Sequence, residues 1–513
     1  MPHVTVASGS ALSASGGARI ADEGGNAVDA AIAATLVSMC TEPGIIAPGA
    51  GGFIAVWPVD GDPVVIDAYA EMPGRGLPAD RFGGGGIAVD MDYGGGMHTI
   101  VGYGSVATPG AFAGLGAASD EFGVLPWEEL VAPAIEAVEA GFPVSRACAS
   151  YMVFAHDAVF GWDPPSHKAL HHDDGTPLGF GETVHLPELV DSLTMLAEMG
   201  PGVLYRGELG RRIVAGVQAQ GGLLTEQDLA AYEPVVRAPV TVDLDGWRVA
   251  TTPPPAVGGS CMAAMLLLFH GAGIQGWSRE SVPVIEEIQR AVLEFRRAHL
   301  DATAGERADE AMALIELASG GDAGALLGSP STTHTSAVDD LGNACAVTVS
   351  AGYGSGAMPG GTGFWLNNSL GELELAPGGF HGLVPGTRLI SNMAPTVARR
   401  ADGACLAIGS PGADRITTAL SSVLYRHLQL GEPLMDAIHA PRSHAEVFDG
   451  ARRFAHEPGL DTSLLTAVAA RPFEGRSMYF GGVQAVARSA DGWLEGAADD
   501  RRVGAVAGGG SRA

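Results

Sequence analysis

The chain has 513 residues, 46% of them hydrophobic, which is enough for one large α/β enzyme or for two or three average domains. Its 58 acidic and 29 basic residues give a formal charge of −29, so we expect no nucleic-acid partner and no attraction to anionic membranes. No apolar run approaches the roughly 20 residues that cross a bilayer, which also argues against a membrane partner.

The start of the chain, from Met1 to Ser8, has no basic segment followed by an apolar stretch, so we expect no secretory signal and a cytoplasmic location. The cysteines are widely spaced and odd in number, a pattern that predicts neither disulfides nor a zinc site but small buried side chains. These residues are Cys40, Cys148, Cys261, Cys345 and Cys405. The sequence therefore predicts no metal.

The first part of the chain predicts one helix and two strands around a glycine-rich turn. Small residues at 29–39 predict a helix that can lie close to a sheet, and Pro43 stops it shortly afterwards. The glycines at 48–53 lead into a strand at 54–57, and another strand follows at 64–67. No Lys-Ser/Thr pair follows these glycines, so they are not a phosphate-binding loop, and we expect no cofactor.

Helical patterns dominate the middle of the chain. The clearest lie at 127–140, 186–199, 260–270 and 282–300. A nearby cluster of histidines and aspartates has the side chains for a metal, but its spacing matches no usual ligand motif, and prolines and a glycine flank it. We therefore expect a solvated loop at His167, His171, His172, Asp173 and Asp174.

Two runs, 331–339 and 344–350, alternate small polar and apolar residues around an acidic, glycine-containing turn, which predicts a β-hairpin. A threonine hydroxyl is a poor nucleophile unless a base lies beside it, and its own α-amino group is such a base once the preceding peptide bond is cut. The Ser331-Thr332 bond, at the strand entrance and after a small, flexible segment at 320–325, suits such a cut. The alternative is an ordinary strand, because β-branched residues favour strands anyway.

Downstream, a short strand at 405–408 ends in the turn 409–413, and a helix is expected to begin near Asp414. Such a helix aims its free N–H groups at whatever lies above the strand, an arrangement that suits an oxyanion. An ordinary strand-to-helix turn is the alternative. The glycine-containing tail at 508–513 is expected to be disordered.

Several segments resemble the γ-glutamyltransferase family. The segment Thr332-Thr333-His334-x-Ser336-x-Val338-Asp339-x-x-Gly342-Asn343-Ala344 is similar to the start of that family's small subunit. Other similar segments stand in the same order along the chain, at 24–31, 221–229, 253–259, 359–368, 391–396, 409–416 and 440–444. Each similar segment alone is weak evidence for the family, but together the segments cover nearly the whole chain, and their shared order makes the resemblance specific.

The resemblance implies an α+β fold, the four-layer αββα Ntn-hydrolase sandwich, in which two stacked antiparallel sheets lie between helical layers. It also implies a precursor that cuts itself before Thr332, giving a large-subunit portion, 1–331, and a small-subunit portion, 332–513, as one interleaved unit. The expected partners are a small-molecule substrate and the two fragments themselves, as a heterodimer whose further dimerisation is left open.

By the same resemblance, Thr332 is the nucleophile and its freed α-amino group, with a pKa of about 7.7–8.0, is the base. The backbone N–H groups of Gly412 and Ala413 are expected to hold the oxyanion. Ser350 matches a position where the family uses a threonine hydroxyl to orient the nucleophile, although a serine at the end of a strand can equally have no such role.

The substrate-binding segments depart from the family. Tyr69 stands where the family has an arginine, and a neutral phenol cannot form a bidentate ion pair with a carboxylate. A replacement cation such as Arg75 is left open. Glu372 falls where an aspartate usually holds an amino group, and Gly352 where an asparagine is usual. The predicted substrate-binding residues are Tyr69, Asn368, Glu372, Ser391 and Asn392.

Three hypotheses follow. The first is a self-processed threonine hydrolase or acyltransferase that moves a γ-glutamyl-like or other acyl group from an amide to water or an amine. The second is a C–C bond hydrolase of an alkylproline-type antibiotic pathway, because family relatives are assigned such a reaction and Tyr69 suits a ring-containing substrate. The third is an uncleaved binding protein, which the retained Thr332, Ser350 and Gly412 argue against.

Overall fold

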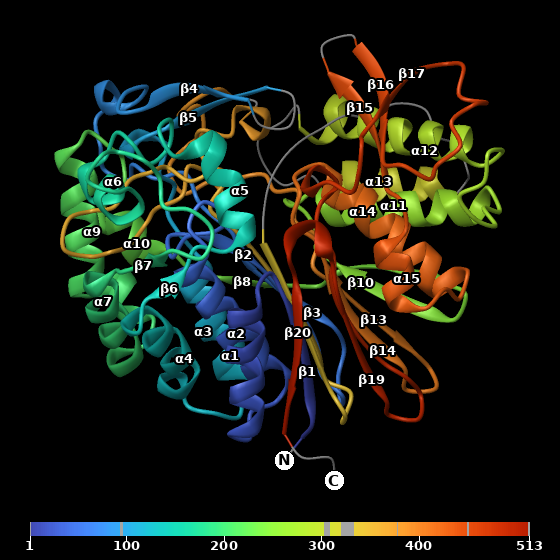
Figure 1. The fold of residues 1–513 in the computed structure, drawn as a ribbon, viewed down its shortest axis with the longest axis horizontal. Coiled ribbons are helices and arrows are strands. Elements are labelled where there is room, and N and C mark those ends of the chain that lie inside the picture. Colours follow the sequence, from blue (N-terminus) through green and yellow to red (C-terminus); the bar gives the residue numbers. More distant parts are fainter. Residues whose placement is uncertain are drawn as a thin grey trace.

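Two stacked β-sheets form the centre of the computed structural model, which describes residues 2–92, 96–301, 308–319, 333–376, 378–448 and 451–510 (Figure 1). In pairing order, the first sheet contains β20 (Ala505–Gly509), β1 (Val4–Ser8), β11 (Thr333–Asp339), β12 (Ala344–Ser350), β2 (Gly51–Trp57), β3 (Val64–Ala68) and β8 (Val235–Arg237). The second contains β19 (Leu494–Ala498), β18 (Gln484–Arg488), β14 (Cys405–Gly409), β13 (Thr396–Arg400), β10 (Trp247–Thr251) and β9 (Val240–Leu244). Neighbouring strands pair antiparallel throughout both sheets.

The sheets pack face to face. Strand β11 lies against β14 and β18, and β2 lies against β13. The side chains between the sheets are small or apolar, and many are fully buried, among them Ala7, Ala346 and Ala407. Because such side chains leave little space between layers, the interior is close-packed at the point where the two sheets meet.

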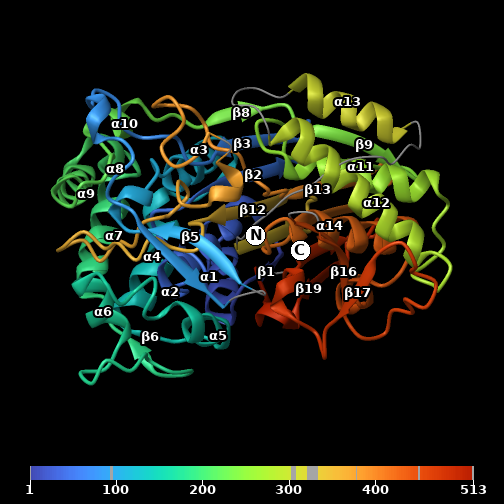
Figure 2. The same cartoon turned by 90° about the horizontal axis from the view of Figure 1, so that it is seen from above.

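Helices cover the outer face of each sheet, as the two views show (Figures 1 and 2). On the first sheet lie α1 (Ala11–Asp22), α2 (Ala27–Thr41) and α3 (Ala111–Phe122), and on the second lie α11 (Gly258–Gly271) and α14 (Arg415–Leu424). Every residue of α2 is buried, because the helix packs on the sheet and is itself covered by α1 and α4 (Trp127–Glu139). The predicted four-layer αββα sandwich of the α+β class is confirmed.

The remaining helices and short sheets surround these layers. The helices are α5 (Arg146–Ala155), α6 (Pro164–Leu170), α7 (Pro187–Met199), α8 (Gly202–Arg206), α9 (Glu208–Ala219), α10 (Glu226–Ala231), α12 (Val282–Phe295), α13 (Ala308–Ser319) and α15 (Leu434–His439). The short strands are β4 (Ile87–Met91), β5 (Met97–Val101), β6 (Phe142–Pro143), β7 (Thr183–Val184), β15 (Ser443–Phe448), β16 (Ala451–His456) and β17 (Ala469–Pro472). Among the described helices, none is long and apolar enough to cross a membrane.

Most predicted helices are confirmed, with one shorter than expected. The helices predicted at 127–140, 186–199 and 260–270 are α4, α7 and α11. Only the first part of the helix predicted at 282–300 is an α-helix. The helix α12 ends at Phe295, and a π-helical turn, Arg296–Leu300, follows it. The guanidinium of Arg296 is buried in this turn, and it donates a hydrogen bond of 3.1 Å to the carboxylate of Asp301. This pairing offsets the unfavourable free energy of burying a charge.

The prediction of a disordered tail at 508–513 is wrong for its first residues. Gly508 and Gly509 belong to β20, which pairs with β1. A Cβ atom built on Gly509 would lie 2.0 Å from the carbonyl oxygen of Ala18 in α1. The glycine therefore permits close helix-strand packing and does not signal flexibility. Residues 511–513 lie outside the described residues.

The histidine cluster is only partly the solvated loop that we predicted. His167 belongs to α6, and His171 is buried with its ring stacked on that of His167 at a centroid distance of 4.2 Å. His172, Asp173 and Asp174 are exposed, as expected. The difference arises because the prolines at 164–165 begin a helix instead of breaking one. The prediction that the cysteines are small buried side chains is confirmed, since all five are buried.

Candidate active site

The hairpin of β11 and β12 brings predicted catalytic segments to one end of the first sheet. Thr333, the first residue of β11, pairs with Val349, and Ser350 follows as the last residue of β12. The predicted hairpin is thus confirmed from Thr333 onward. Ser331 and Thr332, the predicted cleavage site and nucleophile, lie outside the described residues, directly before the first residue of β11.

A buried polar cluster surrounds the beginning of β11. A Cβ atom built on Gly9 would lie 3.2 Å from Thr333 Oγ1 and 3.1 Å from Glu42 Oε2, so both oxygens face the end of β1. Ser38 Oγ donates a hydrogen bond of 2.6 Å to Glu42 Oε1. Burial raises the pKa of Glu42, although serine hydroxyls oppose the shift. Sequence analysis missed this carboxylate; its signal was a charged residue beside an otherwise small and apolar helix.

His334 connects the two sheets next to this cluster. Its Nδ1 lies 2.7 Å from Thr348 Oγ1 and its Nε2 lies 2.7 Å from Ser336 Oγ. Complete burial lowers the pKa of His334 to about 3, so the imidazole is neutral near pH 7. A Cβ atom on Gly409 would lie 2.3 Å from the imidazole ring, so β14 approaches β11 here only because it ends in glycine. His334 therefore fixes β11 against the end of β14.

The turn after β14 contains the predicted oxyanion residues. Gly412 has φ 127° and Ala413 has φ 73°, both in the region that favours glycine. A Cβ atom on Gly412 would lie 2.5 Å from the Cα atom of Gly481, so a second turn packs directly behind the first. Within the described part of the chain, neither the Gly412 nor the Ala413 N–H donates to another backbone group. Both donors therefore remain available to a ligand.

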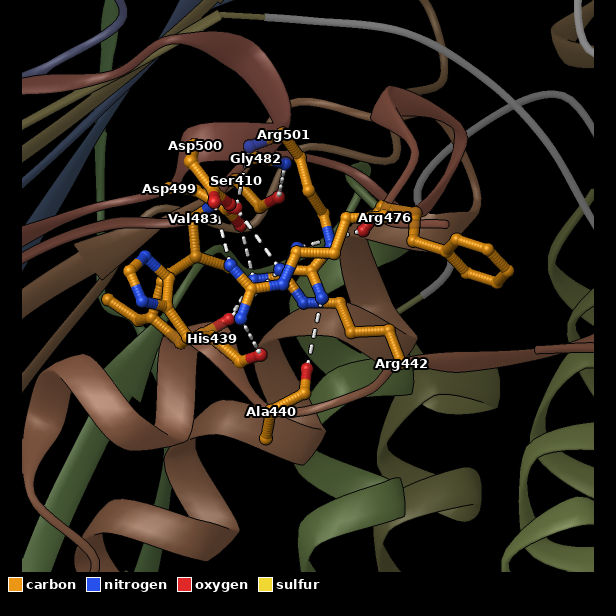
Figure 3. A network of polar contacts seen from close by, with 12 residues as sticks. Ser410, His439, Ala440, Arg442, Arg476, Gly482, Val483, Asp499, Asp500 and Arg501 are labelled. Atoms are coloured by element: carbon orange, nitrogen blue, oxygen red, sulfur yellow. Dashed lines mark hydrogen bonds and ion pairs between the residues drawn. The ribbon is translucent and has the colours of Figure 1, made fainter. Parts of the chain in front are cut away.

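Buried charges hold this second turn in place (Figure 3). Arg442 donates to the carbonyl oxygen of Phe480 at 3.0 Å, and the Val483 N–H donates to Asp499 Oδ2 at 3.0 Å. Arg442 and Asp499 also pair with each other at 2.5 Å. The two ends of the turn 480–483 are thus fixed by one ion pair. Ser410 joins the turns, since its Oγ accepts a 3.1 Å hydrogen bond from the Gly482 N–H.

A second arginine completes this network. Arg501 binds Glu457, with a 2.7 Å hydrogen bond from its Nε, and reaches Asp499 at 3.1 Å. Burial alone would raise the pKa of Asp499, but Arg442 and Arg501 hold that pKa below its ordinary value. Burial also lowers the pKa of Arg442, to about 10, so it stays charged at neutral pH. The family resemblance pointed to the segment 440–444 without giving Arg442 a role, and the place of this arginine in that segment was the available signal.

Tyr69, predicted to contact substrate, packs within the core between the sheets. Its ring stacks on that of Phe53, with centroids 5.8 Å apart and planes 25° apart, and its side chain is buried. Its backbone N–H donates to Asp67 Oδ1 at 3.1 Å. The residue that replaces the expected arginine is therefore an aromatic core residue.

Arg388, which contacts the Tyr69 backbone, and Arg75 are both paired with carboxylates. Arg388 lies 3.7 Å from Asp67 and 3.5 Å from Glu71, and donates to the Tyr69 carbonyl oxygen at 2.6 Å. Arg75 lies 3.1 Å from Glu71 and 3.4 Å from Asp228. Because each guanidinium already faces two carboxylates, neither replaces the missing arginine as a free cation.

Asn368 and Glu372 converge on Gly352. A Cβ atom on Gly352 would lie 2.2 Å from Asn368 Oδ1 and 3.1 Å from Glu372 Oε2. Asn368 Nδ2 donates to the carbonyl oxygen of Ile100 at 3.1 Å, which fixes the orientation of the amide. Its Oδ1 is buried and accepts no hydrogen bond from any described residue. Asn368 Oδ1 and Glu372 Oε2 therefore both face Gly352, and Asn368 Oδ1 remains an acceptor for a ligand N–H group.

Ser391 and Asn392 are both buried at the start of α11. The Val257 N–H donates to the Ser391 carbonyl oxygen at 2.8 Å, and Ser391 Oγ accepts from the Met393 N–H at 3.1 Å. A Cβ atom on Gly258 would lie 1.9 Å from the Asn392 carbonyl oxygen. Backbone contacts thus fix this segment. The structure brings Gly352, Asn368 and Glu372 together in one cluster. Tyr69 and Ser391–Asn392 lie in two other packed segments, which are joined where the Leu389 N–H donates to the Ala70 carbonyl oxygen at 2.9 Å.

Comparison with known proteins gives a consistent result. Residues 13–509 match the family model described as Gamma-glutamyltranspeptidase. The chain is 30% identical to the glutathione hydrolase proenzyme of Escherichia coli (strain K12) over 537 residues, covering 97% of this chain and 90% of that protein. It is 31% identical to the acylase ACY 1 proenzyme of Pseudomonas sp. (strain V22) over 532 residues, covering 98% and 93%.

The fold matches a solved structure over nearly its full length. The cephalosporin acylase of Bacillus halodurans superposes with a TM-score of 0.79 at 23% identity, covering 99% of this chain and 96% of that one. The likeness therefore concerns the whole sandwich, including the end of the sheets where β11 begins.

Proposed function

Because the chain belongs to the gamma-glutamyltranspeptidase family of Ntn hydrolases and transferases, we propose that it cuts itself before Thr332 and then uses Thr332 as the nucleophile on an acyl amide. One observation carries the proposal: β11 begins directly after Thr332, between Ser350 on its own sheet and the turn with Gly412 and Ala413 after β14. A nucleophile, an orienting hydroxyl and two free N–H donors are thereby expected at one place.

In the precursor, Thr332 Oγ1 attacks the carbonyl carbon of Ser331. The new C–O bond forms as the Ser331–Thr332 C–N bond breaks, and the hydroxyl proton passes to the leaving nitrogen, which gives an ester and a free α-amine. Water then hydrolyses the ester to a carboxylate on Ser331 and a free hydroxyl on Thr332. This order explains how one residue supplies both the nucleophile and, afterwards, its base.

Strand order supports a cleaved chain that stays together as a heterodimer. In the first sheet β1 belongs to 1–331 and lies between β20 and β11, which both belong to 332–513. In the second sheet β13 of the small portion pairs with β10 of the large portion. Separating the fragments would break both sheets, so we infer that one cut leaves the fold intact. The relatives' names as proenzymes support such a cut.

In the mature enzyme the α-amine of Thr332 accepts the hydroxyl proton while Oγ1 attacks the substrate carbonyl. The N–H groups of Gly412 and Ala413 stabilise the oxyanion, and Ser350 orients the nucleophile. The amide C–N bond then breaks, the proton passes to the leaving amine, and an acyl ester on Thr332 remains. Water or a second amine attacks this ester, takes the acyl group and returns the proton to Thr332.

We propose that the acyl group is not a simple γ-glutamyl group. Asn368 retains a buried acceptor that suits an amino group, but the carboxylate end of a glutamyl group finds only Tyr69 and arginines that are already paired. The name of the similar Pseudomonas acylase supports an acyl amide of another kind. C–C bond hydrolysis with the same nucleophile stays a second candidate, because Tyr69 stands in place of the expected arginine while Arg75 and Arg388 are already paired.

The decisive experiment is the intact mass under denaturing conditions of the wild type, Thr332→Ala and Thr333→Ala. The wild type and Thr333→Ala should give two fragments that divide before residue 332, whereas Thr332→Ala should give one chain of 52.2 kDa. One uncut chain in all three would refute the mechanism and favour a binding protein. Release of 4-nitroaniline from acyl anilides then separates amide hydrolysis from C–C hydrolysis.

A further inference from the structure

The short segment that contributes Arg442 to the turn 480–483 also reaches the turn 409–413. His444, two residues after Arg442, belongs to β15, and its side chain is buried. Its Nε2 lies 3.2 Å from Asp414 Oδ2. Asp414 directly follows the turn 409–413 and is the N-cap of α14. One segment therefore contacts the supports of both turns.

The carboxylate of Asp414 is buried and is fixed from two sides. Besides the contact with His444, Arg415 Nη1 lies 2.6 Å from Asp414 Oδ1. Burial alone would raise the pKa of Asp414, but Arg415 and His444 hold this pKa below its ordinary value. Because an ionised carboxylate only accepts hydrogen bonds, His444 Nε2 carries a proton and donates it to the bond with Asp414.

A threonine hydroxyl holds the other ring nitrogen of His444. Its Nδ1 lies 3.2 Å from Thr418 Oγ1 in α14, and the same hydroxyl donates to the Arg415 carbonyl oxygen at 3.2 Å. Contacts at both nitrogens fix the orientation of the imidazole. The strand is fixed as well, because Gln289 Oε1 of α12 accepts a hydrogen bond of 3.2 Å from the Ala445 N–H.

Arg415 connects this network to the turn 480–483. Its Nε donates to the Tyr479 carbonyl oxygen at 3.0 Å, and its Cζ atom lies 4.6 Å from the centroid of the Tyr479 ring. Tyr479 directly precedes that turn. The ring of His444 also meets the Tyr479 ring edge-on, with centroids 6.4 Å apart. The groups around Asp414 thus join the two turns.

The backbone at Ala413 needs such support. Its φ of 73° lies in the region that favours glycine, and another residue keeps this conformation only where its surroundings fix it. The Ile416 N–H donates to the Ala413 carbonyl oxygen at 3.1 Å, so α14 holds the peptide group after Ala413. The peptide group before it carries the N–H of the predicted oxyanion site. The carboxylate of Asp414, one residue later, is an anchor for the direction of that N–H.

We propose that His444 is a positioning residue of the reaction, which holds Asp414 and thereby directs the Ala413 N–H at the oxyanion. The proposal rests on the proposed function, because it assigns a role within that acyl transfer. His444 acts through Asp414 and does not itself contact the substrate. Since the oxyanion develops only toward the transition state, the effect should fall on kcat and leave KM almost unchanged.

Substitution of His444 in the whole chain tests this role, with the better substrate of γ-glutamyl and phenylacetyl 4-nitroanilide. His444→Leu removes the donor to Asp414, so kcat should fall by about 100-fold while KM stays within about twofold. His444→Gln keeps an N–H donor and should recover kcat to within about fivefold of the wild type. His171→Leu is the control, because it removes another buried, hydrogen-bonded imidazole, at the end of α6, and should leave kcat unchanged.

Thr418→Val keeps the test decisive if His444→Leu does not fold. It removes only the hydroxyl beside His444 Nδ1 and should lower kcat by about tenfold. Thr35→Val is its control, because the Thr35 hydroxyl also bonds a carbonyl oxygen of its own helix, that of Ala31. Thermal unfolding reports whether each variant folds. Wild-type kcat in folded His444→Leu or Thr418→Val, equal losses in His444→Leu and His444→Gln, or a loss caused by KM would overturn the role.

Hydrogen exchange separates this role from the proposed reaction. Exchange of the amides at 412–414 needs no turnover and should become about tenfold faster in His444→Leu but not in His444→Gln or His171→Leu. If the wild type proves uncut and inactive, the proposed reaction fails, and this exchange pattern would still support the positioning of the turn by His444. Equal exchange at 412–414 in all variants would overturn the positioning, even where the wild type cuts itself and turns over substrate.

Discussion

Two neighbouring regions of the molecule are built differently. The proposed reaction end comprises the beginning of β11, the end of β12 and the turn 409–413, and the proposed recognition wall comprises Gly352, Asn368 and Glu372. Interior strands, close glycine contacts and the pair of Arg442 with Asp499 hold the reaction end. Side chains form the recognition wall. We therefore expect the chemistry to depend on backbone positions that many contacts fix, and the substrate specificity to depend on a few side chains that can change without disturbing the sheets.

The largest effect should come from Gly412→Ala at the reaction end. The new Cβ atom would meet the Cα atom of Gly481 at 2.5 Å, and φ at 127° is unfavourable for alanine. Displacement of the turn removes oxyanion donors, so kcat/KM should fall by about 1,000-fold, and self-cleavage should slow in parallel. Gly360→Ala is the control, because a Cβ atom there meets nothing within 4 Å. Unchanged kinetics in Gly412→Ala would contradict the assignment of this turn.

Arg442→Lys tests the support behind the reaction end. A lysine cannot bond the Phe480 carbonyl oxygen and Asp499 together in the same geometry, so the free energy of unfolding should fall by about 3 kcal/mol. The matched change Arg476→Lys, in an exposed pair with Asp500, should cost less than about 1 kcal/mol. Denaturant unfolding measures the free energy of unfolding of both variants. The pH profile of kcat shows whether a displacement of the turn 480–483 also affects the reaction. Equal losses of unfolding free energy in the two variants would contradict the prediction that the buried pair stabilises the fold more than the exposed pair.

The buried His334 predicts how stability depends on pH. Its pKa is about 3 in the folded state against 6.5 in the unfolded chain, so the unfolded state binds more protons between these values and stability falls as pH decreases below 6.5. The loss should reach about 3 kcal/mol by about pH 4.5. His334→Gln should flatten this part of the curve, with His98→Gln at an exposed position as control. Identical slopes in the wild type and His334→Gln would refute the prediction.

The smallest effect should come from Gly352→Asn in the recognition wall. The side chain would displace Asn368 Oδ1, which lies 2.2 Å from the new Cβ position, so KM should rise by about tenfold while self-cleavage continues. Asparagine tolerates the φ of 63° at this position. Gly361→Asn, at φ 74° with open space around it, controls for the backbone strain. A loss of self-cleavage in Gly352→Asn alone would show that the two regions are coupled.

The local sequence pattern was enough to predict many of the helices and strands correctly. The alternation at 344–350 and the small residues at 29–39 gave strand and helix correctly, because each periodicity reflects one buried face or a closely packed environment. Glycine-rich sequence did not distinguish an ordered strand from a disordered tail. Gly509 lies in strand β20, although a glycine-rich end of a chain is typical of disorder. A missing side chain serves both flexibility and close packing, and only the neighbour, here Ala18, distinguishes the two.

The sequence by itself determined the family resemblance, the order of elements and the identity of the catalytic candidates, since these depend on residue types at fixed spacings. Only the tertiary structure decided that Tyr69 stacks in the core, that Arg75 and Arg388 are already paired, and that Asn368 presents an unused acceptor beside Glu372. These features depend on distances between residues far apart in the chain. Charge and hydrogen bonding act through space, so the pairing of each group is fixed only when the sheets close.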